Sequence, residues 1–455
     1  MGFKHSKGRL ERLAKVLFTP SPEAADAASP VPNEQRNVLR VLVAAQIFSG
    51  AGIAAGVTVG ALLAEEMLGT TTLAGIPSAL FTGGSAAAAV LIGRISGKRG
   101  RRPGLATGYA LGALGSAAVV FSAILDNPVL LFMSLFIYGS GTATNLQARY
   151  SGADLATPNY RAQAISTVLV VTTLGGVVGP NLASPMQGVA ELIGIPKYAG
   201  PFILSGFAYG AAAAVIGMFL KPDPLLRAKE LAAAGETRLE VPSVSTSASD
   251  SGLDDNGEPI VDPSIRHGLF VGAMVLVLSQ LVMVAIMTMT PVHMKDHGHA
   301  TSATGLVIAL HVAGMYLPSP ISGRLTDRLG RTTMAVASGV TLLVSGIVAA
   351  LAPAESVPLI AFALFLLGLG WNFGVVSGTA IITDNVPLAT RAKKQSSVDV
   401  AIALAGASGG LVSGVVMSLS NYAALGLAGG FLALAMVPVV FRMANKLRGV
   451  ALASS

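Results

Sequence analysis

Three ionisable residues lie in or beside long apolar stretches of this sequence. Arg149 lies near the end of one stretch, His311 lies in the middle of another, and Asp399 lies near the start of a third. Ionisable side chains are costly in an apolar environment, so they are functional candidates by default. Histidine titrates near neutral pH, and a carboxylate can carry a proton or pair with a cation. We therefore predict that these three residues take part in proton coupling or ligand binding.

Each of the three residues also has a structural alternative. His311 can be a neutral histidine bonded to a neighbouring backbone or hydroxyl group. Asp399 can form a lid salt bridge with Lys393 or Lys394. Arg149 can hold an anionic substrate or close the inner gate, and its structural alternative is a pair with Asp154. The sequence leaves these alternatives open.

Neutral polar residues in the same apolar stretches complete the candidate site. An aromatic ring there can stack on a bound molecule and an amide can orient it, whereas the alternative is helix packing with interhelical hydrogen bonds. The predicted cavity residues are Gln46, Tyr138, Asn145, Asn181, Gln280, Tyr316, Trp371 and Asn372.

The sequence shows no signature of an enzyme. It has no cysteine, no G-x-x-x-x-G-K-[ST] phosphate loop, and no evident nucleophile–base pair. His293, His297 and His299 lie in one loop, but Lys295 between them argues against a dedicated metal site. We therefore expect no catalytic residue, no cofactor and no metal.

The elements that position these residues are membrane-spanning helices. The chain is 52% hydrophobic and only 12% charged, and its apolar residues fall in blocks of about 20, the length that crosses a bilayer as a helix. This pattern predicts an all-α membrane protein with twelve transmembrane helices. The predicted spans are 38–64, 72–94, 103–124, 128–150, 163–184, 199–220, 268–291, 303–323, 333–352, 357–381, 396–418 and 424–442.

The distribution of basic residues predicts the orientation. Of the 30 Lys and Arg residues, all but Lys197 and Lys295 fall on one side of the predicted spans. The positive-inside rule then places both termini in the cytoplasm and the chain in the cytoplasmic membrane, as a multi-pass protein. Contact with anionic membrane lipid explains the basic balance, so no nucleic acid is expected.

The chain divides into five segments at these boundaries. Residues 1–37 form a cytoplasmic tail in which 3–18 predict an amphipathic helix on the membrane surface, and residues 443–455 form the second tail. Residues 38–220 and 267–442 each form a predicted six-helix bundle. Residues 221–266 are the predicted cytoplasmic linker, flexible over 233–265, where Ser, Gly, Asp and Pro are frequent.

The two bundles are related by an internal repeat with a constant offset of 230 residues. Such duplications are typical of secondary transporters that bind their substrate between the repeats. The repeated pairs are Gly93 and Gly323, Arg94 and Arg324, Gly100 and Gly330, Arg101 and Arg331, Asp154 and Asp384, Arg161 and Arg391, and Ser166 and Ser396.

With this repeat and its motifs, the whole chain resembles a bacterial drug/proton antiporter of the major facilitator superfamily. The family signature G-x-x-x-D-R-x-G-R-R is nearly complete in the second half, but the first half has Gly97 in place of the aspartate. The resemblance implies a cytoplasmic latch of charge pairs, and the alternative is that the basic loops only enforce topology. The implied latch residues are Gly93, Arg94, Arg101, Asp154, Arg161, Gly323, Asp327, Arg328, Arg331, Asp384 and Arg391.

The predicted fifth helix carries Gly175, Gly179 and Pro180, which resemble a G-x-x-x-G-P motif of proton-coupled exporters in this family. The alternative is ordinary close packing of small residues. The basic residue that many such exporters carry in the outer half of the fourth helix is absent from 128–139.

The resemblance favours a monomeric secondary transporter that exports a small molecule in exchange for protons. The alternatives are an importer of a small metabolite or vitamin, a membrane sensor or scaffold that does not transport, and a lipid flippase.

Overall fold

The computed structural model describes residues 29–68, 75–239 and 263–440. The predicted amphipathic segment at 3–18, the C-terminal tail and most of the predicted flexible linker lie outside these ranges. The described residues are almost wholly helical, as predicted. The main helices are α3 (Pro32–Leu68), α4 (Gly75–Arg99), α5 (Arg101–Ile124), α6 (Pro128–Ala153), α7 (Arg161–Leu192), α8 (Gly200–Phe219), α9 (Pro224–Leu239), α10 (Pro263–Asp296), α11 (Thr301–Tyr316), α12 (Ser319–Leu329), α13 (Arg331–Leu351), α14 (Val357–Asn385), α15 (Arg391–Leu419) and α16 (Tyr422–Leu434).

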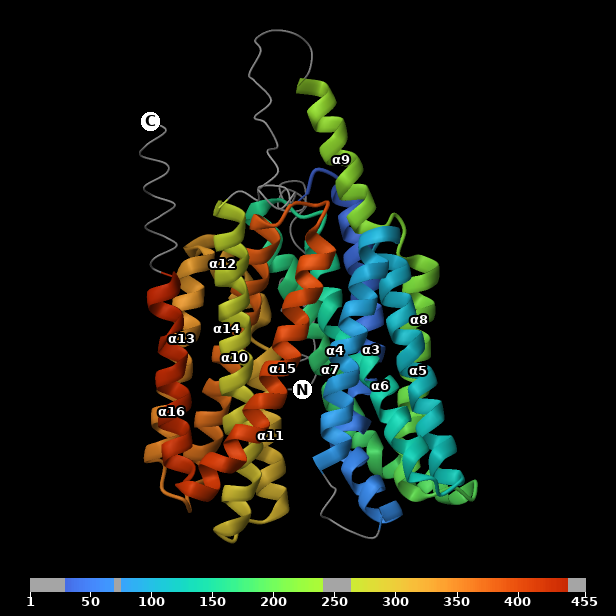
Figure 1. The fold of residues 1–455 in the computed structure, drawn as a ribbon, viewed down its shortest axis with the longest axis vertical. Coiled ribbons are helices and arrows are strands. Elements are labelled where there is room, and N and C mark those ends of the chain that lie inside the picture. Colours follow the sequence, from blue (N-terminus) through green and yellow to red (C-terminus); the bar gives the residue numbers. More distant parts are fainter. Residues whose placement is uncertain (1–28, 69–74, 240–262, 441–455) are drawn as a thin grey trace, which may run out of the picture.

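The helices form two groups that stand side by side along the long axis (Figure 1). We name α3–α8 the N bundle and α10–α16 the C bundle. In the described ranges, ten stretches are long and apolar enough to cross a membrane. One of them joins α11 and α12. The short break between these helices contains Pro318 and is followed by Pro320, and proline has no backbone N–H. Helices α3 and α7, of 37 and 32 residues, add two further long helices to the N bundle, which is consistent with twelve spans.

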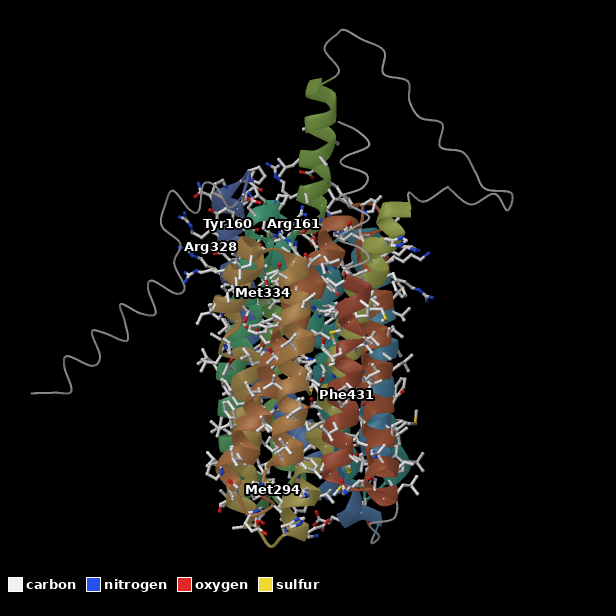
Figure 2. All side chains as sticks on the ribbon, turned by 90° about the vertical axis from the view of Figure 1, so that its left-hand side faces the viewer. Tyr160, Arg161, Met294, Arg328, Met334 and Phe431 are labelled. Atoms are coloured by element: carbon white, nitrogen blue, oxygen red, sulfur yellow. The ribbon has the colours of Figure 1, made fainter. Side chains whose placement is uncertain are left out.

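One end of the molecule collects the basic interhelical turns, and we name it the basic end. Figure 2 places Tyr160, Arg161 and Arg328 at this end and Met294 at the opposite end. Gly100 and Gly330, at equivalent positions of the repeat, make the sharp turns into α5 and α13 there. Their φ angles of 97° and 95° lie in the left-handed region that favours glycine, which explains this residue at both positions.

Small residues let the helices approach each other closely. A Cβ atom added at Gly84 of α4 would lie 1.7 Å from the carbonyl oxygen of Phe136 of α6. A side chain larger than hydrogen at this crossing would separate the two helices, so glycine here allows close backbone packing.

The two bundles meet along two seams at the basic end. In one seam, Ser396 of α15 donates a hydrogen bond to the carbonyl oxygen of Ala89 of α4, at 2.6 Å. In the other, a Cβ atom on Gly323 of α12 would lie 2.5 Å from the hydroxyl of Ser166 of α7. The equivalent contact of Gly93 with Ser396 shows that the repeat produces a nearly symmetric junction.

Helix α9 lies in the segment that we expected to join the bundles, so the helical part of this segment reaches Leu239. Asp223 accepts hydrogen bonds from the backbone N–H of Leu225, at 3.1 Å, and of Arg102, at 2.7 Å. Arg227 pairs with Glu34 of α3 at 2.8 Å. These contacts attach α9 to the N bundle.

Candidate functional site

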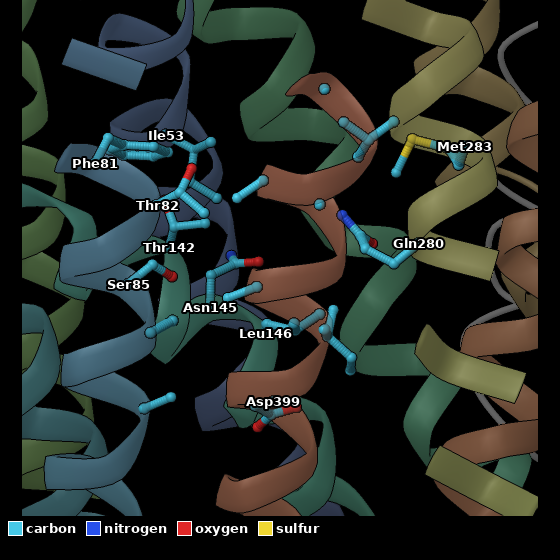
Figure 3. A pocket seen from close by; sticks show the side chains of 18 of the residues that line it. Ile53, Phe81, Thr82, Ser85, Thr142, Asn145, Leu146, Gln280, Met283 and Asp399 are labelled. Atoms are coloured by element: carbon cyan, nitrogen blue, oxygen red, sulfur yellow. The ribbon is translucent and has the colours of Figure 1, made fainter. Parts of the chain in front are cut away.

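A cavity of about 520 Å³ lies between the two bundles. Its lining comes from α3, α4 and α6 on one side and from α10, α11, α14 and α15 on the other. Figure 3 shows Phe81, Asn145 and Gln280 around this space, with Asp399 at one end of it. Both bundles therefore contribute to a single site, as expected when a substrate binds between repeats.

The cavity is closed toward the basic end and reaches the surface toward the opposite end. Asp399, which lines its inner end, is 4% exposed, whereas Leu411, three turns further along α15, is 76% exposed. Ala79, on the facing helix α4, is exposed as well. The lining thus runs from a buried residue near the basic end to exposed residues toward the opposite end.

An ion pair between the bundles closes the inner end of the cavity. Arg149 Nη2 of α6 lies 2.8 Å from Asp399 Oδ1 of α15, and both side chains are buried. The Tyr150 hydroxyl donates a second hydrogen bond to the same oxygen, at 3.1 Å. The other carboxylate oxygen, Oδ2, is buried and has no hydrogen-bond partner among the described residues.

The remaining donors of Arg149 are also occupied. Its Nε donates to Thr379 Oγ1 of the C bundle at 3.0 Å, its Nη1 donates to the Leu146 carbonyl oxygen, and its guanidinium carbon lies 4.2 Å from the Tyr150 ring centre. Arg149 therefore pairs with Asp399 and not with Asp154, which was one of the alternatives. It contacts both bundles at the point where the cavity ends.

His311 lies apart from this site. It is fully buried, Nδ1 hydrogen-bonds with the Leu364 carbonyl oxygen at 2.8 Å, and Nε2 has no partner within the described ranges. It packs between α11 and α14 of the C bundle and does not line the cavity. This arrangement matches the structural alternative, a histidine bonded to a neighbouring backbone.

Half of the predicted cavity residues line the cavity. Asn145, Gln280, Tyr316 and Trp371 do so. Three others are buried inside their own bundles. Gln46 hydrogen-bonds to Asn145 and Thr172, and Tyr138 hydrogen-bonds to Gly52. Asn372 hydrogen-bonds to Met315 and Ser319. The side chain of Asn181 lies outside the described residues.

A buried polar network holds Asn145 in place. Its Nδ2 donates to Gln46 Oε1 at 3.2 Å and to Ser49 Oγ at 2.9 Å. Gln46 Oε1 also accepts from the Tyr109 hydroxyl at 2.6 Å, and Gln46 Nε2 donates to Thr172 Oγ1. Because every amide donor has a partner, the orientation of the Asn145 side chain is fixed.

The predicted latch residues form two charge clusters at the basic end, related by the repeat. In one cluster Asp384 accepts from Arg161 at 2.6 Å and from Arg331 at 2.9 Å. In the other, Asp154 pairs with Arg101 at 2.8 Å and lies 3.8 Å from Arg391. Each cluster joins the two bundles.

Of the remaining latch residues, two lie at contacts between the bundles and two lie on the protein surface. Gly93 and Gly323 lie in the two seams described above, whereas Arg94 and Arg328 are exposed. Asp154 pairs with Arg101, the latch arginine at the start of α5.

The two seams differ in one carboxylate. Asp327 accepts hydrogen bonds from the backbone N–H groups of Ala162 and Gln163, at 3.2 and 3.0 Å, and so caps the first turn of α7 in the other bundle. The equivalent position in the N bundle is Gly97, which faces Ala392 in the first turn of α15 and provides no such cap. The seam between α12 and α7 is therefore the better stabilised of the two.

Of the three residues of the predicted exporter motif, Gly175 is the one whose surroundings the structure describes, and it lies at a close helix crossing. A Cβ atom on Gly175 would lie 2.5 Å from the backbone of Gly50 and Ala51 of α3. The side chain of Pro180, like the surroundings of Gly179, lies outside the described residues.

Sequence reasoning missed three residues that complete these contacts: Tyr150, Thr379 and Gln395. Gln395 accepts from Arg101 Nη2 at 2.6 Å and thus links the Asp154 cluster to α15. Thr379 could have been found, because it lies 230 residues after Arg149, the offset of the repeat. Positions equivalent in two symmetric bundles can meet near the axis that relates them.

Comparison with known proteins identifies relatives of the chain. A family model described as the Major Facilitator Superfamily matches residues 41–301 and 269–451. The uncharacterized MFS-type transporters YdeG and YddS of Bacillus subtilis are 53% and 51% identical, and both comparisons cover 89% of this chain and 91% and 90% of the relative. The riboflavin transporter RfnT of Brucella anthropi is 27% identical over 90% of this chain and 97% of its own length.

Solved structures share the fold. The human organic anion transporter MFSD10 superposes with a TM-score of 0.68 at 17% identity, over 89% of this chain and 99% of that one. The proton:xylose symporter XylE superposes with a TM-score of 0.67 at 14% identity, over 90% and 96%.

Proposed function

The chain belongs to the Major Facilitator Superfamily, and we propose that it is a proton-coupled transporter that moves a small neutral molecule through its central cavity by alternating access. The family and the relatives at about 50% identity establish the coarser statement: this is a multi-pass membrane transporter and not an enzyme. The predicted fold is confirmed.

The single observation that carries the coupling proposal is the state of the Asp399 carboxylate. One oxygen accepts from Arg149 and Tyr150, while the other lacks a partner, and the residue lines the cavity. A proton that enters through the cavity can bind to this second oxygen. Protonation removes the negative charge that holds Arg149, and the ion pair between the bundles is lost.

Loss of this pair has a mechanical consequence. Asp399 belongs to the C bundle, and its two donors belong to the N bundle. When the pair breaks, the bundles lose a buried charge-assisted contact at the closed end of the cavity and can rock apart there. We therefore assign coupling to Asp399 with Arg149, and we assign His311 a structural role within the C bundle.

We propose that the basic end is cytoplasmic, in line with the positive-inside rule. The cavity, which is closed at that end, then opens to the outside, and the two charge clusters act as the latch of the outward-facing state. Both termini are cytoplasmic in this orientation.

We propose export as the direction, because the sequence around Gly175 resembles the motif of proton-coupled exporters. Uptake is a second candidate, favoured by a specific observation: a relative that matches over 90% of this chain is named a riboflavin transporter. A vitamin-like heterocycle would also suit a cavity lined by Phe81, Tyr316 and Trp371.

The test uses purified protein in sealed vesicles that contain a pH-sensitive dye, under an imposed proton gradient. Riboflavin and a panel of neutral aromatic drugs are added in turn. A compound that dissipates the gradient only when the protein is present supports the proposal, and radiolabelled compound then shows the direction. If one compound is transported at the same rate with and without the gradient, and no proton moves, proton coupling is refuted.

A further inference from the structure

We infer that the substrate is a planar neutral molecule with an N–H donor and a carbonyl acceptor on its rim, such as a cyclic amide or imide. This inference rests on the proposed function and adds the chemical class of the substrate. It follows from two amide side chains that face the cavity from opposite bundles, each with one hydrogen-bonding group unused.

Asn145 supplies an acceptor from the N bundle. Both hydrogens of its Nδ2 are donated, to Gln46 and Ser49, which leaves Oδ1 without a donor in the part of the chain that the structure describes. The residue is 5% exposed and lines the cavity, and Figure 3 shows its oxygen directed into the space between the bundles. A ligand that covers this oxygen must donate a hydrogen bond to it, because a carbonyl oxygen that becomes buried without a partner is costly.

Gln280 supplies a donor from the C bundle. Its Oε1 accepts from Trp371 Nε1 at 2.7 Å, which fixes the orientation of the amide. Its Nε2 makes no hydrogen bond to any described residue, and Figure 3 shows the nitrogen directed toward the cavity. This group can donate to a carbonyl oxygen of a bound molecule.

The other side chains that line the cavity determine which kind of ring system can carry these two groups. Trp371 and Tyr316 meet edge to face, with ring centres 5.6 Å apart, and Phe81 faces them from the N bundle. The charge of Asp399, the ionisable carboxylate in the lining, is already compensated by Arg149. Such walls favour a flat aromatic ring and disfavour an ion that would enter without a counter-charge.

The first test compares three probes of nearly equal size for binding to the purified wild-type protein. 1-Methylquinazoline-2,4-dione carries one imide N–H between two carbonyls, and its 1,3-dimethyl derivative has no N–H. In 4-amino-1-methylquinazolin-2-one an amino donor replaces one carbonyl and an unprotonated ring nitrogen replaces the N–H. We expect the dione to bind at least about tenfold more tightly than either analogue, because the dimethyl derivative has no N–H for Asn145 and the amino analogue presents its donor and acceptor in the reversed order. Equal affinities for the dione and its dimethyl derivative, or no binding of any probe, would overturn the inference.

The second test replaces the hydrogen-bond donor of Gln280 with an acceptor. Gln280→Glu keeps an oxygen for Trp371 and changes Nε2 into an acceptor with almost no change in shape. We expect the preference for the dione over the amino analogue to fall about tenfold or to invert. Because this is a ratio measured on one protein sample, a partial loss of folded protein does not affect it. The matched control Gln187→Glu, on α7 outside the cavity lining, should leave the ratio unchanged.

The two proposals fail separately. If Gln280→Glu leaves the preference unchanged while a transported compound still moves protons in the vesicle assay, the substrate class is wrong and the transport proposal stands. If the dione binds as expected but no compound moves protons, the substrate class stands and proton coupling is wrong.

Discussion

The carboxylate of Asp327 should control how often the transporter opens at its basic end. It accepts two backbone hydrogen bonds from the first turn of α7, which belongs to the other bundle, and these must break when the bundles separate. Asp327→Asn removes the charge and one of the two acceptors. Charge-assisted hydrogen bonds contribute about 1.5–3 kcal/mol each, and a charge at a helix N-terminus adds a few tenths to one.

We estimate a loss of about 2 kcal/mol from the closed state, since an asparagine oxygen retains one of the bonds. This corresponds to an increase of about 30-fold in the ratio of open to closed molecules. The ion pair of Asp327 with Arg331 adds little to this value, because Arg331 keeps its bond to Asp384.

The chain contains no cysteine, so a single introduced thiol can report the opening. Ser166→Cys places it in the seam against Gly323, where the serine hydroxyl is fully buried and has no partner in the described structure. A maleimide can react only when the seam opens, so the labelling rate follows the open population. We expect Asp327→Asn to increase this rate about 30-fold in membrane vesicles.

A substitution at Gly97 should have the opposite effect on the opening of the basic end. A Cβ atom there would lie 3.9 Å from the Ala392 side chain, an ordinary contact, so Gly97→Asp can place a carboxylate at the first turn of α15. We expect it to slow the labelling of Ser166→Cys. An unchanged rate in Asp327→Asn, or faster labelling in Gly97→Asp, would refute the assignment of the latch to this position.

Three further predictions concern stability and use the midpoint of thermal unfolding in detergent. Arg149→Met leaves the Asp399 carboxylate buried without its cation and should lower the free energy of unfolding by about 3–5 kcal/mol. The double variant with Asp399→Asn should recover most of this loss, and an equal loss in both variants would contradict the pairing. Tyr150→Phe removes one hydrogen bond to the same carboxylate and should cost about 1 kcal/mol, and a stabilised variant would argue against this bond. Gly84→Ala pushes α4 away from α6 and should destabilise the protein by about 1–3 kcal/mol. Gly305→Ala adds a methyl group in open space and should leave the stability unchanged. Equal losses of stability in the two variants would refute the packing argument.

Much of the fold could be predicted from the sequence, because a bilayer demands apolar helices of defined length and leaves few alternatives. The offset of the repeat also predicted which charges stand at equivalent positions, and Arg101 with Asp154 and Arg331 with Asp384 are indeed related in this way. The break between α11 and α12 coincides with prolines that are visible in the sequence.

The candidate site was less predictable. Arg149 and Asp399 are 250 residues apart, and their pairing depends on how the two bundles dock, which no local pattern encodes. His311 and Asn372 lie on helices that are apolar on every side, so periodicity does not reveal which face meets the cavity and which meets a neighbouring helix. Their depth in the membrane could be predicted, but their direction required the structure.

The central claim is that Asp399 couples protons to substrate. The most direct test measures protons exchanged when a transported compound binds to the purified protein in weakly buffered solution. We predict that binding moves protons in the wild type and in His311→Ala, and that it moves none in Asp399→Asn although the compound still binds. Equal proton exchange in Asp399→Asn and the wild type, or its loss in His311→Ala alone, would contradict the claim.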